Sequence, residues 1–424
     1  MIFGLETDHF KEPRPSALYR PFADESTAND WTVINGIAAA RVYTDIISEY
    51  TALHHGTALV DLGIQNRYAI HGHDAAKFLC RLSSTPANDI LVSESARGLI
   101  LNSEGYVVDF CSVTRLSKES FLLTTSIQID RRLRIAARGY DIGFDNITDT
   151  VAALGIFGPN ALKTAAAAGF VVTGDTLASH GKVRGVEAFA RPVELGHTSG
   201  IEIIFPAEEA LTLWERVRRN NEIIAAGTAS CEIVRIEAGQ ARPGIDFCPA
   251  DAPALSGKRI PSEINAPHLA PLNRTWFNGR RAILDTEPTR ELIPLVADAD
   301  EVIPGTPVYE RPIGSPKNTA NIHPIGTITS AAFSPRYKAA ICFADIPFDH
   351  KRRTGLLIGS NGTGHFTAIG GGGETSANRL NEDGIPGVLN AYVKTRRMDT
   401  PETDAALVFK KSAKKATERQ SFFV

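Results

Sequence analysis

Two segments of the chain follow the same pattern of hydrophobic and polar positions: residues 67–82 and residues 152–169. Each begins with an apolar run typical of a strand, passes through Gly72 or Gly158, and continues with apolar residues at helical spacing. The glycine allows a sharp turn, and the Asp74 or Asn160 that follows can cap the helix. The two glycines lie 86 residues apart. The pattern therefore predicts two related α+β lobes that arose by duplication.

Further apolar runs predict other elements of the two lobes. Residues 98–116 and 120–129 are apolar runs separated by a short polar turn, which is typical of a hairpin. Residues 208–220 show helical spacing. The apolar face that this spacing predicts consists of Ala210, Leu211, Trp214 and Val217.

The rest of the chain has a different pattern. Residues 243–272 are rich in Pro, Ala and Ser, which indicates a long loop that crosses between lobes. From about residue 292, short strands alternate with turns, which indicates a small all-β domain. Residues 359–373 are rich in glycine but lack the spacing of a phosphate- or dinucleotide-binding loop, so we expect a flexible loop. The basic segment 410–419 is expected to be a solvated tail.

Composition and charge argue against several classes of function. The 424 residues include 45 Lys+Arg and 48 Asp+Glu, so the formal charge is −3, and no strong field attracts nucleic acid or an anionic membrane. The longest apolar runs fall far short of the roughly 20 residues that span a bilayer. The first residues lack the basic and apolar regions of a signal peptide. We therefore expect a soluble cytoplasmic protein that acts on a small molecule, without a nucleic-acid or membrane partner.

Cysteine and histidine patterns argue against a metal site. The five cysteines are spread along the chain without a CxxC pair, and the eleven histidines include no HExxH motif. We expect neither a disulfide framework nor a bound metal.

Eight segments between residues 57 and 335 resemble, in order, the aminomethyltransferase superfamily, which includes the glycine-cleavage T-protein and related tetrahydrofolate-dependent demethylases. The segments are TALVDLGIQNRYAIHGHDAAKFLCRL, ILNSEGYVVDFCSVTRL, LGIFGPNAL, LGHTSGIEIIFP, VRIEAG, TWFNGRRAIL, IPGTPVY and IGTITSAAFSP. The resemblance implies an α+β fold, a three-lobed T-protein-like ring with two duplicated α+β lobes and a C-terminal small β-barrel domain. The domains expected on this basis are 1–150 (first lobe with an N-terminal extension), 151–230 (second lobe), 231–290 (crossover returning to the first lobe) and 291–424 (β domain and basic tail).

The resemblance also implies a chemistry. Members of this superfamily bind tetrahydrofolate in a central channel and move a one-carbon unit between a small substrate and the pterin. The segment LGHTSGIEIIFP is similar to the family segment GYTGxxGxEI, which places Glu202 on the pterin-holding glutamate and His197 where a tyrosine is usual. A carboxylate there would accept hydrogen bonds from the pterin edge and stabilise developing positive charge. The alternative for Glu202 is an exposed strand carboxylate.

One departure from the family pattern concerns its catalytic aspartate. The family strand motif GGxxDDxxVxRL carries this residue as its second Asp, whereas EGYVVDFCSVTRL matches Asp109 to the first Asp and has Phe110 in the second place. Successive side chains of a strand point to opposite faces, so Asp109 cannot replace the missing carboxylate without a bulge or a slip. We therefore expect Asp109 to be structural and Phe110 to line the pocket.

A second departure lies just before VRIEAG, where amino-donor members carry an arginine and this chain has Cys231. Arg235 matches the second family arginine, and its cation would suit a folate glutamate tail or a substrate carboxylate. Cys231 is expected to be a small buried residue. The candidate catalytic residues are Asp109, Cys231 and His197, and the candidate cofactor-binding residues are Glu202, Phe110 and Arg235.

Three hypotheses for the function follow. The first is a one-carbon enzyme that removes or transfers a methyl- or hydroxymethyl-type group from a small aromatic or uncharged substrate, with tetrahydrofolate as acceptor, and does not carry out glycine cleavage. The second is a folate-independent lyase on the same fold that uses a general base and releases formaldehyde. The third is a non-catalytic folate-binding or regulatory protein. Titration with tetrahydrofolate separates the first from the second.

Overall fold

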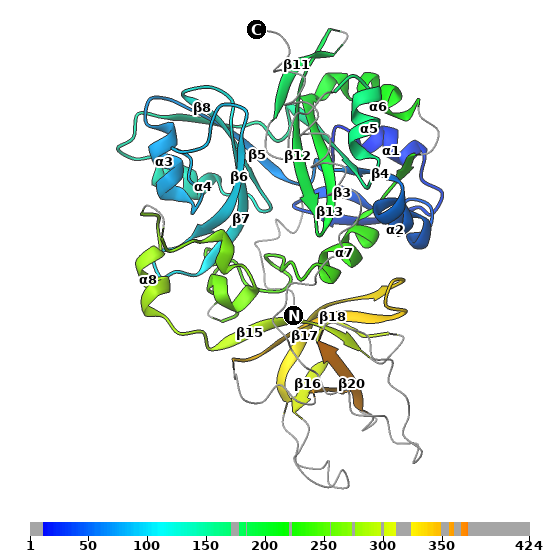
Figure 1. Ribbon diagram of the computed structural model, residues 1–424, viewed down its shortest axis with the longest axis vertical. Coiled ribbons are helices and arrows are strands. Elements are labelled where there is room, and N and C mark those ends of the chain that lie inside the picture. The colour runs from blue at the N-terminus through cyan, green and yellow to red at the C-terminus, as the bar shows by residue number, and fades with distance from the viewer. Residues whose placement is uncertain are drawn as a thin grey trace, which may run out of the picture.

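Two α+β lobes lie side by side above a β-barrel (Figure 1). The computed structural model describes residues 12–170, 178–183, 185–219, 223–254, 256–273, 276–297, 301–310, 324–348, 356–359 and 366–371. The basic segment 410–419 lies outside the described residues.

The first lobe is built on a five-stranded antiparallel sheet with the order β6-β7-β8-β5-β9. Its elements are β5 (Asn66–His71), α3 (Ala75–Leu82), β6 (Ser95–Leu101), β7 (Val107–Arg115), β8 (Ser120–Thr125), α4 (Asp130–Ala136) and β9 (Gly143–Asn146). Phe78 and Leu79 of α3 and Leu133 of α4 pack with Tyr68 and Ile70 of β5 in one buried cluster. The two helices thus cover one face of the sheet and leave the other face for the second lobe.

The second lobe is built on a six-stranded sheet with the order β11-β12-β13-β10-β4-β14. Its strands are β4 (Thr57–Asp61), β10 (Val151–Phe157), β11 (Ser179–Val183), β12 (Val186–Leu195), β13 (Thr198–Pro206) and β14 (Ile223–Ala225). Its helical elements are α1 (Tyr19–Asp24), α2 (Ile46–His55), α5 (Ala161–Ala167), η1 (Ala207–Glu209), α6 (Ala210–Arg218) and α7 (Thr228–Glu237). A small sheet of β1 (Arg14–Pro15), β3 (Ile37–Val42) and β2 (Asp30–Ile34) shares its core through Ala40 and the neighbouring Tyr43.

The order of the strands confirms the predicted duplication. Each lobe runs from a strand through a glycine into a helix and then into three antiparallel strands, the last of which pairs with the first: β5-α3-β6-β7-β8 and β10-α5-β11-β12-β13. Gly72 and Gly158 have φ values of +130° and +107°. A Cβ atom at these positions would lie 2.4 and 2.5 Å from a backbone oxygen. Both turns therefore require glycine for conformation and for space.

The predicted helix caps are wrong in one respect. Asp74 and Asn160 occupy the N-cap positions of α3 and α5, but neither side chain caps its helix. The carboxylate of Asp74 instead accepts a hydrogen bond from the backbone N–H of Asp141 at 3.0 Å. A backbone N–H of a distant loop therefore takes the place of the expected helix N–H groups.

The helix predicted over 208–220 is present as η1 and α6, but one residue of its buried face is wrong. Leu213 is 1% exposed, whereas Leu211 is 59% exposed. Ala210, Trp214 and Val217 are buried as predicted. Together with Leu213 they form the i, i+3, i+4, i+7 stripe that one helix face presents to a sheet.

The predicted first lobe, 1–150, is corrected at its N-terminal part. Strand β4 pairs with β10, with Leu59 opposite Ile156, so it belongs to the sheet of the second lobe. Leu18 and Phe22, which precede it, lie in the core of that lobe. Consecutive strands are neighbours only about two-thirds of the time, so a strand pattern at 57–61 does not identify its partner.

The C-terminal β domain is a closed barrel with the strand order β15-β18-β17-β16-β19-β20. The strands are β15 (Arg290–Ala297), β16 (Pro307–Glu310), β17 (Pro324–Ser334), β18 (Ala339–Pro347), β19 (Leu356–Gly359) and β20 (Phe366–Gly371). Strand β20 corrects the expected flexible loop, because residues 366–371 pair with both β19 and β15. Closure leaves no free sheet edge, and backbone pairing alone can hold a glycine-rich strand there.

The crossover loop after α7 returns to the first lobe. It contains η2 (Pro261–Ile264), η3 (Pro267–Leu269) and α8 (Arg280–Asp285). The N–H of Val107 donates to the carbonyl of Arg259 at 2.8 Å, and the N–H of Ala250 donates to the carbonyl of Val107 at 2.9 Å. The loop therefore extends the edge of the first lobe between its sheet and the barrel.

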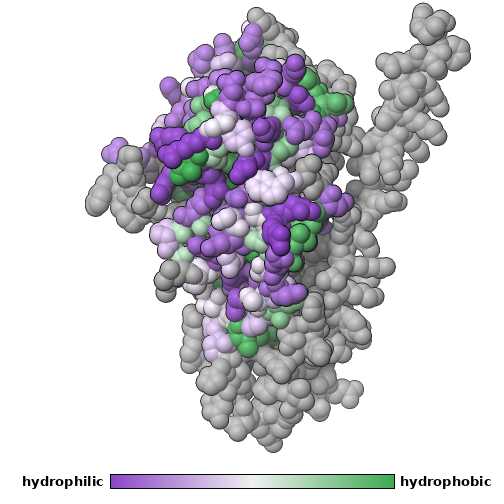
Figure 2. All heavy atoms as spheres, turned by 90° about the vertical axis from the view of Figure 1, so that its left-hand side faces the viewer, coloured by the Kyte–Doolittle hydropathy of each residue, from purple (hydrophilic) through white to green (hydrophobic). Residues whose placement is uncertain are grey.

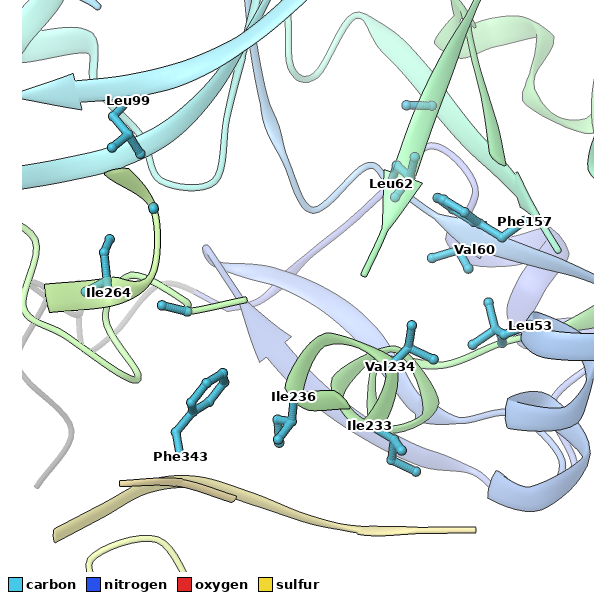
Figure 3. Packing of buried hydrophobic residues seen from close by; sticks show 14 of the residues in the cluster. Leu53, Val60, Leu62, Leu99, Phe157, Ile233, Val234, Ile236, Ile264 and Phe343 are labelled. Carbon is cyan, nitrogen blue, oxygen red and sulfur yellow. The ribbon is translucent and has the colours of Figure 1, made fainter. Parts of the chain in front are cut away.

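The largest hydrophobic cluster lies where the two lobes and the barrel meet (Figure 3). Leu99 comes from β6, Phe157 from β10, Ile236 from α7, Ile264 from η2 and Phe343 from β18. This central cluster fixes the two sheets and the barrel relative to one another. On the face shown in Figure 2, by contrast, hydrophobic residues form small groups separated by hydrophilic ones.

Candidate functional site

The two sheets face each other through a row of polar side chains. On the first lobe, strand pairing aligns Ser112 of β7 with Thr124 of β8, and Thr124 with Arg67 of β5. On the second lobe, Arg191 of β12 lies directly opposite Glu202 of β13. Directly paired residues project from the same face of a sheet, so each lobe presents its own polar group to the other.

Glu202 lies between two arginines, one from each lobe. Its Oε1 accepts a hydrogen bond from Nη2 of Arg67, and its Oε2 accepts one from Nε of Arg191 at 2.6 Å. The exposed fractions of the three side chains are 1% for Glu202, 1% for Arg67 and 3% for Arg191. Burial alone would raise the pKa of Glu202, but the charges of Arg191 and Arg67 outweigh it and lower the pKa to about 2. The carboxylate is therefore ionised at any physiological pH.

Most of the remaining donors of the two arginines are paired, but the buried Nε of Arg67 has no hydrogen-bond partner among the described residues. Arg191 donates to the hydroxyls of Ser112 at 3.1 Å, Thr114 at 2.8 Å and Thr124 at 3.0 Å. Nη1 of Arg67 donates to the carbonyls of Leu62 and Gln65. Removing one partner of such a buried ion pair typically costs about 3–5 kcal/mol, because the other charge stays buried and unpaired.

One expectation for Glu202 is thereby corrected. It is not an exposed strand carboxylate, because the residue is fully buried. Each of its oxygens accepts one hydrogen bond from an arginine, and its role as a pterin ligand remains a prediction. Sequence reasoning missed Arg67 and Arg191. The available signal was an arginine inside each of two strand segments.

Phe110 lies on the same face of β7 as Ser112, beside the polar row. Its ring packs against Phe247 of the crossover loop, with the ring centroids 6.3 Å apart and the planes at 66°. The ring is half-buried and belongs to the edge of the central cluster, next to its strand partner Leu99. The facing sheets thus form a polar half around Glu202 and an apolar half around Phe110.

Asp109 projects to the opposite face of β7, towards the core of the first lobe. Its carboxylate accepts three backbone N–H groups, from Phe110 at 2.8 Å, Ser126 at 2.7 Å and Ile127 at 2.9 Å. Burial raises its pKa to about 7, although these N–H bonds act in the other direction. In this position Asp109 holds the loop that follows β8.

A bulge in β7 sets these orientations. Ile100 pairs with Asp109, but the next residue, Leu101, pairs with Val107, so Val108 is an extra residue on β7. Val107 and Phe110 consequently both contact the central cluster although they are three residues apart. The bulge lies before Asp109 and does not bring its carboxylate to the central face.

Cys231 is a partly buried free thiol on α7, packed against the central cluster. Burial, with smaller contributions from the charges of Glu49 and Glu232, raises its pKa to about 12. The thiol is therefore neutral and a poor nucleophile at physiological pH. His197 occupies the exposed turn between β12 and β13.

Arg235 joins α7 to the barrel and to the crossover loop. It donates to the carboxylates of Glu232 and Asp246, to the carbonyl of Gln240 and to the hydroxyl of Ser330. These contacts use all five of its N–H donors. A role in cofactor binding remains a prediction, and this geometry does not support it.

A second buried polar cluster, also missed in the sequence, lies where α2, α7 and the barrel meet. The carboxylate of Glu237 accepts hydrogen bonds from the hydroxyls of Tyr50 (2.9 Å) and Ser334, and its Oε2 lies 3.5 Å from Nε2 of His54. Burial would raise the pKa of Glu237, but the contacts with His54, Ser334 and Tyr50 lower it. This cluster fixes α2 on the barrel.

Two surface hollows lie away from the facing sheets. One of about 320 Å³ lies along α2, and one of about 460 Å³ lies between the ends of α5 and α6. None of the candidate catalytic or cofactor-binding residues lines either hollow.

Two duplicated α+β lobes, a C-terminal barrel and a candidate site between the facing sheets define an aminomethyltransferase-like protein. Residues 21–258, more than half of the chain, match the GCVT N-terminal domain, and the chain belongs to this family.

Curated relatives are distant in sequence. A probable aminomethyltransferase of Halobacterium salinarum (strain ATCC 29341 / DSM 671 / R1) is 24% identical over 310 residues, covering 69% of this chain and 80% of the relative. An aminomethyltransferase of Thermoanaerobacter sp. (strain X514) is 25% identical over 324 residues, covering 73% of this chain and 83% of the relative.

A solved structure shows the same fold. The crystal structure of glycine cleavage system aminomethyltransferase T from Bartonella henselae superposes with a TM-score of 0.72 at 20% identity, covering 84% of this chain and 96% of that chain. Within the part of the chain that the structure describes, no helix has the length and apolar character needed to cross a membrane.

Proposed function

We propose that this chain removes or transfers a one-carbon group from a small aromatic or uncharged substrate, and that it does not carry out glycine cleavage. The observation that carries the proposal is the position of Phe110. Its half-buried ring lies on the central face of β7, where the family resemblance places a carboxylate. An apolar wall of this kind suits a neutral substrate better than an amine.

The neutral side chain of Cys231 supports the same choice of substrate. The thiol stands where amino-donor members carry an arginine, and its raised pKa leaves it without charge. The arginine of this helix, Arg235, has no N–H donor left for a substrate carboxylate. Neither residue offers a free cation to a charged amino-acid donor.

Tetrahydrofolate is the one-carbon acceptor that the family implies, and the residues present do not fit it. The pterin N–H donors would have to compete at Glu202 with two buried arginines, because each carboxylate oxygen already accepts a charge-assisted hydrogen bond from one of them. This observation favours a second candidate, a lyase that releases formaldehyde from a hydroxymethyl-bearing substrate. In that reaction a base takes the hydroxyl proton, the carbon–carbon bond breaks to give formaldehyde, and the remaining carbanion takes up a proton.

A panel of donors tests the proposal. The purified chain is incubated with methoxy-aromatic, hydroxymethyl-bearing, N-methylamine and glycine donors, each with and without tetrahydrofolate. Formaldehyde and methylated or methylene folates are measured. We expect turnover only of neutral donors. Faster turnover of the amine or glycine donors would contradict the proposal, and formaldehyde release without folate would select the lyase.

A further inference from the structure

We infer that Arg67, Glu202 and Arg191 form an ion triad that joins the two lobes and takes the place of a pterin site, so that this chain does not bind tetrahydrofolate. The inference deepens the proposed function, on which it rests for the chemical consequence given below. The evidence for the triad itself comes from the contacts, the packing and the charge of these residues.

The triad connects the two sheets directly. Arg67 belongs to the first lobe, whereas Glu202 and Arg191 belong to the second. Arg67 reaches across to Glu202, and Arg191 reaches back to three hydroxyls on β7 and β8. Every member therefore makes at least one contact with the opposite lobe. A carboxylate that served only a ligand would not need a cation from each side.

The space beside Glu202 is filled as well. Its strand neighbour on β10 is Gly155, where a Cβ atom would lie 2.4 Å from the ring of Phe157 and 3.0 Å from Leu62. A Cβ atom at Gly200, on the same face of β13, would also lie 2.4 Å from this ring. The Phe157 ring thus covers both glycines, and Arg191 occupies the other flank of Glu202. A planar pterin that reached the carboxylate along this face of the sheet would have to displace the Phe157 ring or Arg191.

Charge opposes displacement of the triad by a ligand. The guanidinium groups cannot lose their protons at physiological pH, whereas the pterin amide and amine are neutral donors. If a pterin displaced an arginine from Glu202, a charge-assisted hydrogen bond would be replaced by a weaker one from a neutral donor. The displaced arginine would stay buried without its carboxylate partner.

The consequence concerns the substrate. Without a folate acceptor, a methyl ether cannot give formaldehyde unless an oxidant is present. A hydroxymethyl carbon already has the oxidation level of formaldehyde, so it leaves with transfer of protons only. The substrate class that fits is therefore a small neutral molecule bearing a hydroxymethyl group next to a carbon that can carry negative charge.

The first test is a calorimetric titration of the full chain with 5-formyltetrahydrofolate, with no substrate present. We expect no saturable binding up to about 1 mM, the limit at which binding is worth only about 4 kcal/mol. Saturable binding with a dissociation constant of about 1 mM or below would overturn the inference. Because no substrate is present, this result is independent of whether the proposed reaction is found.

The second test measures the triad as a stabilising contact. The variant Glu202→Gln is compared with Glu194→Gln, whose ion pair with Arg97 also joins the two lobes (2.9 Å) but is exposed on both sides. We expect the Tm of the first to fall at least about 5 °C further than that of the second. Equal decreases in Tm for the two variants would contradict the proposed role of the triad. If Glu202→Gln does not fold, Arg191→Lys keeps the charge, loses the forked contacts, and is expected to lower Tm in the same direction.

Discussion

Two consecutive residues of β7 lie in different environments. Phe110 contacts the central cluster, and Asp109 accepts three N–H groups on the opposite face. The alternation follows from the two-residue period of a strand and could be predicted from the sequence. The bulge at Val108 could not be predicted, because it depends on how β6 pairs with β7.

Placing a carboxylate at position 110 is expected to damage the protein. The variant Phe110→Asp must partly desolvate or protonate a carboxyl group in a half-buried apolar setting, so we expect a lower free energy of unfolding and a loss of turnover. Urea unfolding and the donor panel measure both effects.

A matched control separates charge from size at this position. Phe110→Leu keeps the wall apolar and is expected to cost less than about 1.5 kcal/mol. Glycine-cleavage activity is expected to be absent in Phe110→Asp, and its appearance there would show that one residue had excluded amine donors. The double variant with Cys231→Arg tests whether both changes are needed.

At the scale of single elements, α6 shows how much of a helix and its buried face the sequence periodicity can predict. The helix and three of its four predicted core residues are confirmed, but the fourth is Leu213 in place of Leu211. Both leucines fit an apolar stripe in sequence. Which of them is buried depends on the rotation of the helix against the sheet, and α5 and the sheet set that rotation.

The two leucines give a direct comparison of burial on one helix. We expect Leu213→Ala to lower the free energy of unfolding by about 2–5 kcal/mol, because it leaves a cavity in the core. Leu211→Ala is expected to change it by less than about 0.5 kcal/mol, because this side chain is largely exposed. Urea unfolding of both variants checks the difference, and similar losses would contradict the assigned face.

At the scale of the whole molecule, buried ion pairs hold the bodies together, and one of them predicts a dependence on pH. The pKa of Glu202 is about 2 in the folded protein, below its usual value near 4.5. The stabilisation is therefore complete above about pH 4.5 and is lost as the pH falls towards 2. It amounts to something on the order of 3 kcal/mol.

The variant Glu202→Gln isolates this contribution. We expect the difference in unfolding free energy between parent and variant to be constant from pH 6 to 8 and to shrink steadily below about pH 4.5. Chemical unfolding at several pH values measures it. A difference that does not change down to about pH 3 would show that the carboxylate has an ordinary pKa or no ionised partner.

Arg235 makes a comparable contribution to stability between α7 and the barrel. The variant Arg235→Met leaves Glu232 and Asp246 without their cation, so we expect a loss of about 3–5 kcal/mol in unfolding free energy. Limited proteolysis should also cleave the connection between α8 and β15 faster. The control Arg281→Met breaks the exposed pair with Asp285 and is expected to leave both measurements unchanged. Equal behaviour of the two variants would contradict the role of Arg235.

The sequence by itself determined the local and repeated features of this protein. It predicted the two lobes, because each glycine turn requires a residue without a Cβ atom and the apolar periods before and after it are short-range signals. It also predicted the separate β domain and the opposite faces of Asp109 and Phe110. Each of these depends on residues a few positions apart.

Only the tertiary structure decided which partners meet. It placed β4 in the second lobe, added β20 to the barrel, and set Glu202 between Arg67 and Arg191, which lie 135 and 11 residues away in the chain. The sequence motif of Arg235 likewise did not predict that all five of its N–H donors bind other groups of the protein. The sequence shows that a charged residue is present, but whether it faces a ligand or another charge depends on contacts made across lobes, and these form only when the whole chain is folded.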